Sequence, residues 1–272
     1  MKPPLVFSLF ATLPSSIIAG FLILYFSVKG SRHREEKRYD RMLIASVFII
    51  PGSGLCAAVL ACLSRLVPYK LDEYVFRFDL AFGAPGVMLG QFFAPHLWLQ
   101  TAFAAIYNLL PCIWLLVYAV HLWSASEEET KCVVRAYVLF LLLAIPIYLV
   151  FPVCGPYYAF PRFPFEVPAH FAPHLLRLDA PPNGVPSLHA ATALVSVYFL
   201  RRWRMWLLLS SIFLVLTVIA TLESGEHYLF DLIAAGPFTA VVLFLAQDRR
   251  RREVHLRRSA AENAVGLPIA RN

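Results

Sequence analysis

The sequence predicts an all-α fold: a polytopic bundle of transmembrane helices with a six-span core and one extra N-terminal span. Three observations predict it. Of the 272 residues, 59% are hydrophobic and only 15% are charged, and a water-soluble domain cannot bury that much apolar surface. The apolar residues gather into runs long enough to cross a bilayer as helices. Lys and Arg cluster in the short loops beside those runs.

Seven apolar runs are expected to form the spans. Their approximate limits are 5–28, 42–66, 97–123, 132–151, 187–203, 205–222 and 228–246. Prolines inside these runs are interpreted as kinks that a helix bundle tolerates, namely Pro14, Pro51, Pro111, Pro146 and Pro237. The first run is longer than the core of a signal peptide and leads into a basic loop, so we interpret it as a retained span.

The expected organisation has three parts. An N-terminal span and a basic loop occupy 1–41, the six-span core occupies 42–246, and a basic tail occupies 247–272. No segment outside the spans is long enough for a separate globular domain. The five cysteines lie mostly in or beside the spans, so no disulfide framework is expected.

The distribution of positive charge predicts the orientation. With the N-terminus outside, one side of the membrane receives 18 of the 24 Lys and Arg and the other side receives six. The positive-inside rule makes the richer side, with the tail, cytoplasmic. The net charge of +7 therefore reflects loops that flank spans, and no nucleic-acid partner is expected.

Two long connections, 67–96 and 152–186, then lie on the non-cytoplasmic side. Both are too apolar for ordinary water-washed loops. The first mixes apolar and acidic residues, which suggests an interfacial or re-entrant segment, and the second is rich in proline and aromatic residues. We expect both to lie on the bundle and to cap a cavity.

Three ionisable residues converge at the non-cytoplasmic ends of neighbouring spans. His189 begins the fifth span, and His227 follows a very short link before the seventh. Asp231 lies four residues beyond His227, on the same face of a helix. An aspartate one turn inside a span needs a partner, so Asp231 is expected to accept a hydrogen bond from His227 and to select its tautomer.

Two histidines and one aspartate suit more than one chemistry. In phosphoryl transfer through a phosphohistidine, one histidine attacks phosphorus, the aspartate orients it, and the other histidine protonates the leaving oxygen. Backbone N–H groups at the start of a helix near Ser187, and its hydroxyl, would stabilise the phosphate. The same residue types also form a metal-ligand set or a proton relay in a transporter. Any single histidine at a span end is more often a plain interfacial hydrogen-bonding residue.

The segments GVPSLHAATA (184–193) and HYLFD (227–231) resemble the type 2 phosphatidic acid phosphatase superfamily. Its pattern is Lys-x6-Arg-Pro, then Pro-Ser-Gly-His, then Ser-Arg-x5-His-x3-Asp. Pro186, Ser187 and His189 match the second element with Leu188 in place of Gly, and His227 and Asp231 match the third. The resemblance covers roughly 42–246.

The chain also departs from that pattern. Lys-x6-Arg-Pro does not occur, and the Ser-Arg pair of the third element falls on Ala220 and Thr221. Together with FPVCGPYYAFP (151–161) and YKLDEYVFRFDLAFG (69–83), these departures resemble the inositol phosphorylceramide synthase branch, which moves a phosphoinositol head group onto ceramide.

The resemblance implies the roles of the site residues. His227 would be the nucleophile, Asp231 its orienting partner and His189 the general acid. Arg162 and Arg177 would replace the missing phosphate clamps, unless they are loop residues paired with Glu166 or Asp179. Ser187 would bind phosphate, and Tyr157, Tyr158 and Asn183 would line the cavity, unless they are interfacial aromatics and a turn residue.

The expected function is transfer of a phospho-head group, such as phosphoinositol, between membrane lipids at the non-cytoplasmic face. No metal ion and no cofactor are expected. A phosphodiester carries less charge than a phosphomonoester, so the loss of two cationic contacts favours transfer. The main alternative is a lipid phosphate phosphatase that acts on phosphatidate or polyprenyl diphosphate. A transporter and a metal-dependent hydrolase are weaker alternatives.

Overall fold

The computed structural model describes residues 66–168 and 171–264, together with scattered helical positions between 41 and 64. The expected first span and basic loop lie outside these residues, as does most of the expected second span. The described chain is mostly helical, and its strands are two short segments that form one small sheet.

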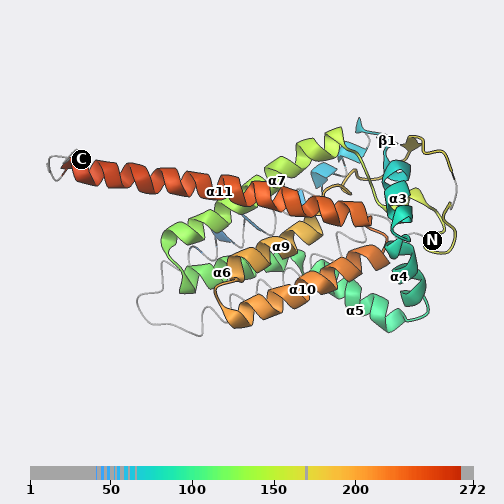
Figure 1. Ribbon diagram of the computed structural model, residues 1–272, viewed down its shortest axis with the longest axis horizontal. Coiled ribbons are helices and arrows are strands. Elements are labelled where there is room, and N and C mark those ends of the chain that lie inside the picture. The colour runs from blue at the N-terminus through green and yellow to red at the C-terminus, as the bar shows by residue number, and fades with distance from the viewer. Residues whose placement is uncertain are drawn as a thin grey trace.

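Six helices form the body of the part of the chain that the structure describes. They are α5 (Leu97–Asn108), α6 (Leu110–Ser124), α7 (Glu127–Val150), α9 (Leu188–Leu200), α10 (Arg204–Glu223) and α11 (Leu229–Ala264). Shorter elements complete the described fold, namely β1 (Tyr69–Lys70), α3 (Asp72–Ala81), α4 (Pro85–Phe93), α8 (Pro156–Ala159) and β2 (Leu176–Arg177). Figure 1 shows β1, α3 and α4 at one end of the bundle, while the C-terminal part of α11 projects from the other end.

Three described helices are long and apolar enough to cross a membrane: Glu127–Val150, Arg204–Glu223 and Leu229–Gln247. The pair α5 and α6 would be a fourth span, although it is bent by 50° at its break. The sequence predicts one continuous span over 97–123, and the structure divides it. Pro111 lies in the first turn of α6, where it lacks an N–H group and disfavours helix in the residue before it.

The helix α9 is shorter than the expected span 187–203. It has 13 residues, begins after the cap residue Ser187 and ends before the link 201–203 to α10. The adjacent helix α7 is longer than expected because a capping box of Ser126 and Glu129 starts it before the apolar run. The count of six spans plus one therefore remains a prediction.

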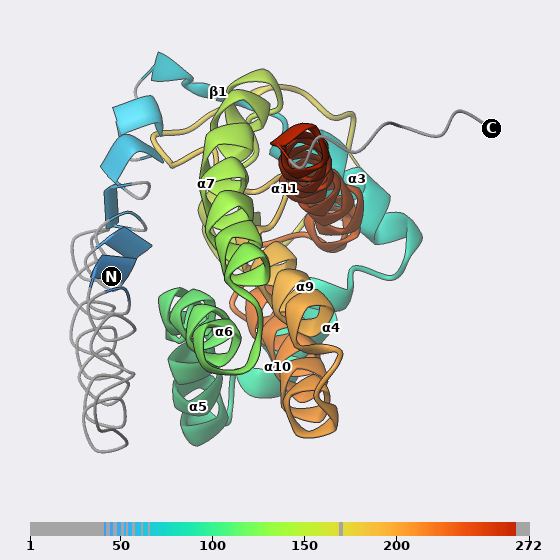
Figure 2. The same cartoon turned by 90° about the vertical axis from the view of Figure 1, so that its left-hand side faces the viewer.

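The bundle is built around α9, which packs against α6, α10 and α11. The end-on view in Figure 2 shows α9 among these helices, with α7 beside α11. In the core, the indole Nε1 of Trp114 donates a hydrogen bond of 3.1 Å to Thr192 Oγ1. The large apolar residues on the outer face of α10 are exposed, namely Met205, Leu208, Leu209, Ile212 and Val215. An apolar face that the protein does not cover is typical of a helix that contacts lipid.

The two long connections meet at one end of the bundle. The first contains β1, α3 and α4, and the second contains α8 and β2. The strands pair antiparallel, with Tyr69 opposite Arg177. The helix α3 packs against α8 and α11, and α4 packs against α10. Both connections therefore lie on the bundle beside the N-terminal end of α11.

Candidate active site

The side chains of His189, His227 and Asp231 form a hydrogen-bonded series. The Nδ1 atom of His227 lies 3.2 Å from Asp231 Oδ2, and its Nε2 atom lies 3.4 Å from Nδ1 of His189. His227 and Asp231 are almost completely buried, whereas His189 is partly exposed. Because the carboxylate accepts the Nδ1 proton, we assign a lone pair to Nε2 of His227, facing His189.

Local structure around Asp231 brings the two helix starts together. The backbone N–H of Tyr228 donates to Asp231 Oδ2 at 2.8 Å, so the same oxygen holds both the His227 ring and the chain beside it. The N–H of Ser187 donates to the Asp231 carbonyl at 3.1 Å. Ser187 Oγ accepts from Ala190 N at 3.3 Å and caps α9, which carries His189 in its first turn. The predicted phosphate ligand Ser187 therefore also has a structural role.

Tyr107 is a site residue that the sequence analysis missed. Its ring stacks on the His189 ring, with centroids 3.7 Å apart and an angle of 24° between the planes. Tyr107 lies at the end of α5, just before the break in the predicted span. Tyr107 lies beside His189 in a structure where α5 is bent relative to α6. No pattern in the sequence around Tyr107 predicts that contact.

The short helix α8 lies against the link that carries His227. Tyr157 N donates to Gly225 O at 2.8 Å, and the rings of Tyr157 and Tyr158 meet edge to face, with centroids 5.3 Å apart. Gly155 has a φ of +100°, and a Cβ atom there would lie 2.3 Å from Glu226 O. Burial raises the pKa of Tyr158, and the nearby charge of Glu226 raises it further. The predicted cavity residues Tyr157 and Tyr158 are thus beside the link.

Two acidic residues of α3, also missed, contact the chain next to His227. Asp72 accepts hydrogen bonds from Tyr228 Oη at 3.0 Å and from Gly155 N at 2.8 Å. Asp79 accepts from Leu229 N at 2.8 Å and from Phe230 N at 3.3 Å. Burial raises the pKa of each carboxyl to about 6. The signal in the sequence is an aspartate pair spaced i, i+7, on the face of α3 that also carries Val75 and Phe76.

The predicted clamps Arg162 and Arg177 lie on the surface. Arg162 is paired with Glu166, and its side chain is 72% exposed. Arg177 is an exposed residue of β2. Within the described residues, no hydrogen bond or ion pair joins either arginine to His189 or His227. The structure therefore does not bring these two arginines together with the histidines.

Two polar groups are buried close in the chain to the elements of the site, namely the Oδ1 atom of Asn183 and the side chain of Lys70. The Oδ1 atom of Asn183 is buried and has no hydrogen-bond partner among the described residues. Lys70 is fully buried, and its ammonium group donates to the Val67 carbonyl. Lys70 and Arg77 keep the Lys-x6-Arg spacing of the first superfamily element, with Phe78 where that element has proline. Burial lowers the pKa of Lys70, whereas Arg77 is exposed.

The geometry of the three central residues differs from that of a metal site. Metal ligands direct their lone pairs at a common point, whereas Asp231, His227 and His189 bond one another in series. Within the described residues, no group of three His, Cys, Asp or Glu is arranged to hold a metal ion. The series instead resembles an oriented nucleophile with a neighbouring acid.

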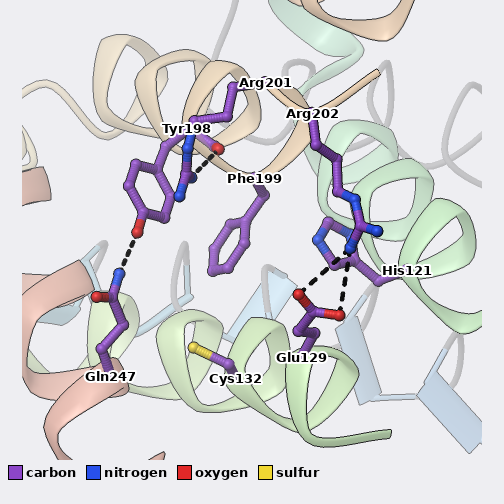
Figure 3. A pocket seen from close by; sticks show the side chains of 8 residues that line it. All are labelled: His121, Glu129, Cys132, Tyr198, Phe199, Arg201, Arg202 and Gln247. Atoms are coloured by element: carbon purple, nitrogen blue, oxygen red, sulfur yellow. Dashed lines mark hydrogen bonds and ion pairs between the residues drawn. The ribbon is translucent and has the colours of Figure 1, made fainter. Parts of the chain in front are cut away.

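A cavity of about 410 Å³ lies at the other end of α9 from His189 (Figure 3). In it, Arg202 Nη1 lies 3.3 Å from both carboxylate oxygens of Glu129, and Gln247 donates to Tyr198 Oη. Its lining contains none of the predicted site residues: His121, Glu129, Cys132, Tyr198, Phe199, Arg201, Arg202 and Gln247. It is therefore separate from the candidate active site.

Comparison with known proteins identifies the family. The sequence model of the PAP2 superfamily matches residues 73–246, which include α3 except its first residue Asp72, both histidines and Asp231. No curated protein and no solved structure matches the chain. A match over well more than half of the sequence, with apolar membrane-type helices, establishes that the chain belongs to the PAP2 superfamily, a family of lipid-acting phosphatases and phosphotransferases.

Proposed function

We propose that the protein is an integral membrane phosphotransferase that moves a phospho-head group, such as phosphoinositol, between lipids through a phosphohistidine at His227. The observation that carries the proposal is the buried series of Asp231, His227 and His189, joined at 3.2 and 3.4 Å. Such a series combines a nucleophile of selected tautomer with an adjacent group that can exchange a proton. The finer assignment to the inositol phosphorylceramide synthase branch is part of this proposal.

The first step forms the covalent intermediate. Nε2 of His227 attacks phosphorus, the bond from phosphorus to the lipid oxygen breaks, and protonated His189 gives its proton to that oxygen. Asp231 holds Nδ1–H of His227, which keeps the lone pair on Nε2 and balances the positive charge that develops on the ring. The two histidine rings must move apart from their 3.4 Å contact to admit phosphorus between them.

The second step releases the head group to an acceptor. Neutral His189 takes the proton of an acceptor hydroxyl, whose oxygen attacks phosphorus while the bond to His227 breaks. A lipid hydroxyl as acceptor gives transfer, and water gives hydrolysis. The scarcity of cationic contacts to the histidines among the described residues supports a singly charged phosphodiester as donor, because a phosphomonoester needs more charge compensation.

The orientation supports a site on the non-cytoplasmic face. The candidate site lies at the start of α9 and α11, while the link 201–203 and the projecting part of α11 carry clustered arginines at the other end. The positive-inside rule would make that arginine-rich end cytoplasmic.

The assay uses purified protein with labelled phosphatidylinositol, with and without ceramide or diacylglycerol, and identifies the products by mass. We expect a new phosphoinositol lipid that requires the acceptor and that forms without added divalent metal. Labelled phosphatidate is incubated in parallel, and release of free phosphate from it, with no transfer product from phosphatidylinositol, would establish the phosphatase alternative. Loss of activity on treatment with a chelator would support the alternative of a metal-dependent hydrolase.

Substitution of the histidines tests the site itself. His227→Ala and His189→Ala are each expected to lower kcat about 10²–10⁴-fold, because each removes a group that exchanges a proton or bonds to phosphorus. The matched control is His96→Ala, since His96 directly precedes α5 and its ring contacts the carbonyl and the ring of Phe92. Full activity in both His227→Ala and His189→Ala would refute the proposed function.

A further inference from the structure

We infer that Asp72 and Asp79 of α3 are positioning residues, which hold the segment 227–231 so that Asp231 faces His227. This inference rests on the proposed function only for its effect on the rate. The two aspartates lie two helical turns apart on one face of α3 and reach the same turn of chain from a distance of about 150 residues in sequence.

Asp79 supplies the N-terminal cap that α11 lacks in its own sequence. The first turn of a helix has N–H groups without partners inside the helix, and Asp79 accepts those of Leu229 and Phe230 at 2.8 and 3.3 Å. The carboxylate of Asp231 lies in the same turn, where it already accepts from Tyr228 N. Because Asp79 already binds the N–H groups of Leu229 and Phe230, these groups do not compete for Asp231 Oδ2, which stays hydrogen-bonded to His227 Nδ1.

Asp72 holds the other side of the same segment. Its carboxylate accepts from Tyr228 Oη at 3.0 Å, from Gly155 N at 2.8 Å and from Cys154 N at 3.1 Å. Asp72 and Tyr228 are completely buried. Because Gly155 packs directly on the Glu226 carbonyl, Asp72 fixes both the residue before His227 and the residue after it.

Neither aspartate contacts the reacting nitrogen of His227. Among the described residues, the Asp79 carboxylate accepts from backbone N–H groups of α11, and the Asp72 carboxylate bonds to Tyr228, Cys154 and Gly155. Their effect on the rate must therefore pass through the position of Asp231 and of the His227 ring. Small displacements of that kind are costly in catalysis, since a shift of about 1 Å lowers rates by about 10²-fold.

The first test reads the tautomer of His227 without any substrate. In protein labelled with ¹⁵N-histidine, the ring shifts of His227, assigned by their loss in His227→Gln, report which nitrogen carries the proton. We expect the Nδ1–H form to dominate in the unchanged protein. In Asp79→Asn and Asp79→Ala the Nε2–H form should become clearly populated. The matched control is Glu73→Gln, a buried acid of α3 that instead binds His174.

The second test measures the rate with the substrate that the transfer assay identifies. Asp79→Asn is expected to lower kcat about 10-fold and Asp79→Ala about 10²-fold, with KM changed less than about twofold. In a double-mutant cycle, Asp79→Ala should cost little in the background of Asp231→Ala, because both act through one contact.

The outcomes separate this inference from the proposed function. An unchanged tautomer and unchanged kcat in Asp79→Ala would overturn the inference and leave the proposed function intact. The melting temperatures of Asp79→Asn and Glu73→Gln are measured beside kcat. If kcat falls equally in both variants, in proportion to the fall in melting temperature, both residues have structural roles alone and the inference is overturned. Full activity of His227→Ala would instead refute the proposed function, while the tautomer shift would still establish the positioning role.

Discussion

At the residue scale, the chemistry depends on how His227 and His189 are held. His227 uses both ring nitrogens, one for Asp231 and one for His189, at 3.2 and 3.4 Å. Tyr107 covers one face of His189 by stacking. The proposed nucleophile His227 and the proposed acid His189 therefore have different partners, and the effect of each partner can be measured separately.

The stacking of Tyr107 gives a prediction at this scale. An aromatic pair contributes about 0.5–1.5 kcal/mol beyond burial of its area, so Tyr107→Ala should lower kcat about 2–10-fold by loosening His189. Tyr107→Phe keeps the ring and should retain nearly full kcat. Steady-state kinetics of the two variants checks this, and an equal loss in both would show that the hydroxyl, not the stacked ring, matters.

At the element scale, α3 is the part of the long connection that reaches the site. Its buried face combines Val75 and Phe76 with Asp72 and Asp79. The apolar residues hold α3 against α8 and α11. Asp79 accepts from the first backbone N–H groups of α11, and Asp72 accepts from residues that directly precede α8 and α11. A segment that composition alone assigns to the membrane interface thus becomes a support for the turn that carries His227.

The buried aspartates predict how stability depends on pH. Asp72 titrates with a pKa of about 6 in the folded chain, against a usual value of 3.8. The folded state therefore binds the proton more tightly, and stability falls as pH rises from 3.8 through about 6. Between pH 5 and pH 7, the titration of Asp72 alone should lower the free energy of unfolding by about 1 kcal/mol.

Thermal unfolding in detergent at pH 5 and pH 7 measures that loss. Asp72→Asn should show a shallower decline than the unchanged protein, while Asp79, whose pKa is also about 6, continues to contribute. The comparison uses the change between the two pH values, so a uniform destabilisation of the variant does not affect it. An equally steep decline would contradict the assignment.

At the scale of the whole molecule, polar and apolar surfaces are separated along the bundle. Figure 1 shows α3 and α4 at one end of the bundle and the projecting part of α11 at the other. The site and the two long connections lie at the first end, the arginine-rich link and tail belong to the second, and exposed apolar side chains of α10 lie between them. This arrangement fits a protein that crosses a membrane and acts on lipid at one face.

The exposed face of α10 gives a test of that arrangement. Val215 lies near the middle of α10 and is 59% exposed. Val215→Arg should oppose insertion by about 2.5–3.5 kcal/mol. Met205→Arg, at an equally exposed position beside Arg204, should be tolerated because its charge lies at the helix end. Recovery of each variant in the membrane fraction measures the difference, and equal recovery would contradict a lipid-facing α10.

The sequence by itself determined the membrane class, the apolar helices and the central contact of the site. These features are local: apolar runs predict α7, α10 and α11, and the four-residue spacing at the start of α11 brings His227 to Asp231. The match to the superfamily motifs depends on the same short segments. The bend between α5 and α6 and the shorter α9 differ from the predicted spans. Pro111 marks the bend in the sequence, but a proline alone does not distinguish a kink within one span from a break between two helices.

Only the tertiary structure decided what surrounds that contact. Three residues of the site are far from the histidines in the chain, namely Tyr107, Asp72 and Asp79. Arg162, by contrast, forms an ion pair with Glu166 on the surface. The physical reason is that such contacts depend on how the connections pack on the bundle. Packing is the sum of many weak interactions across the fold, and no spacing within one segment encodes it.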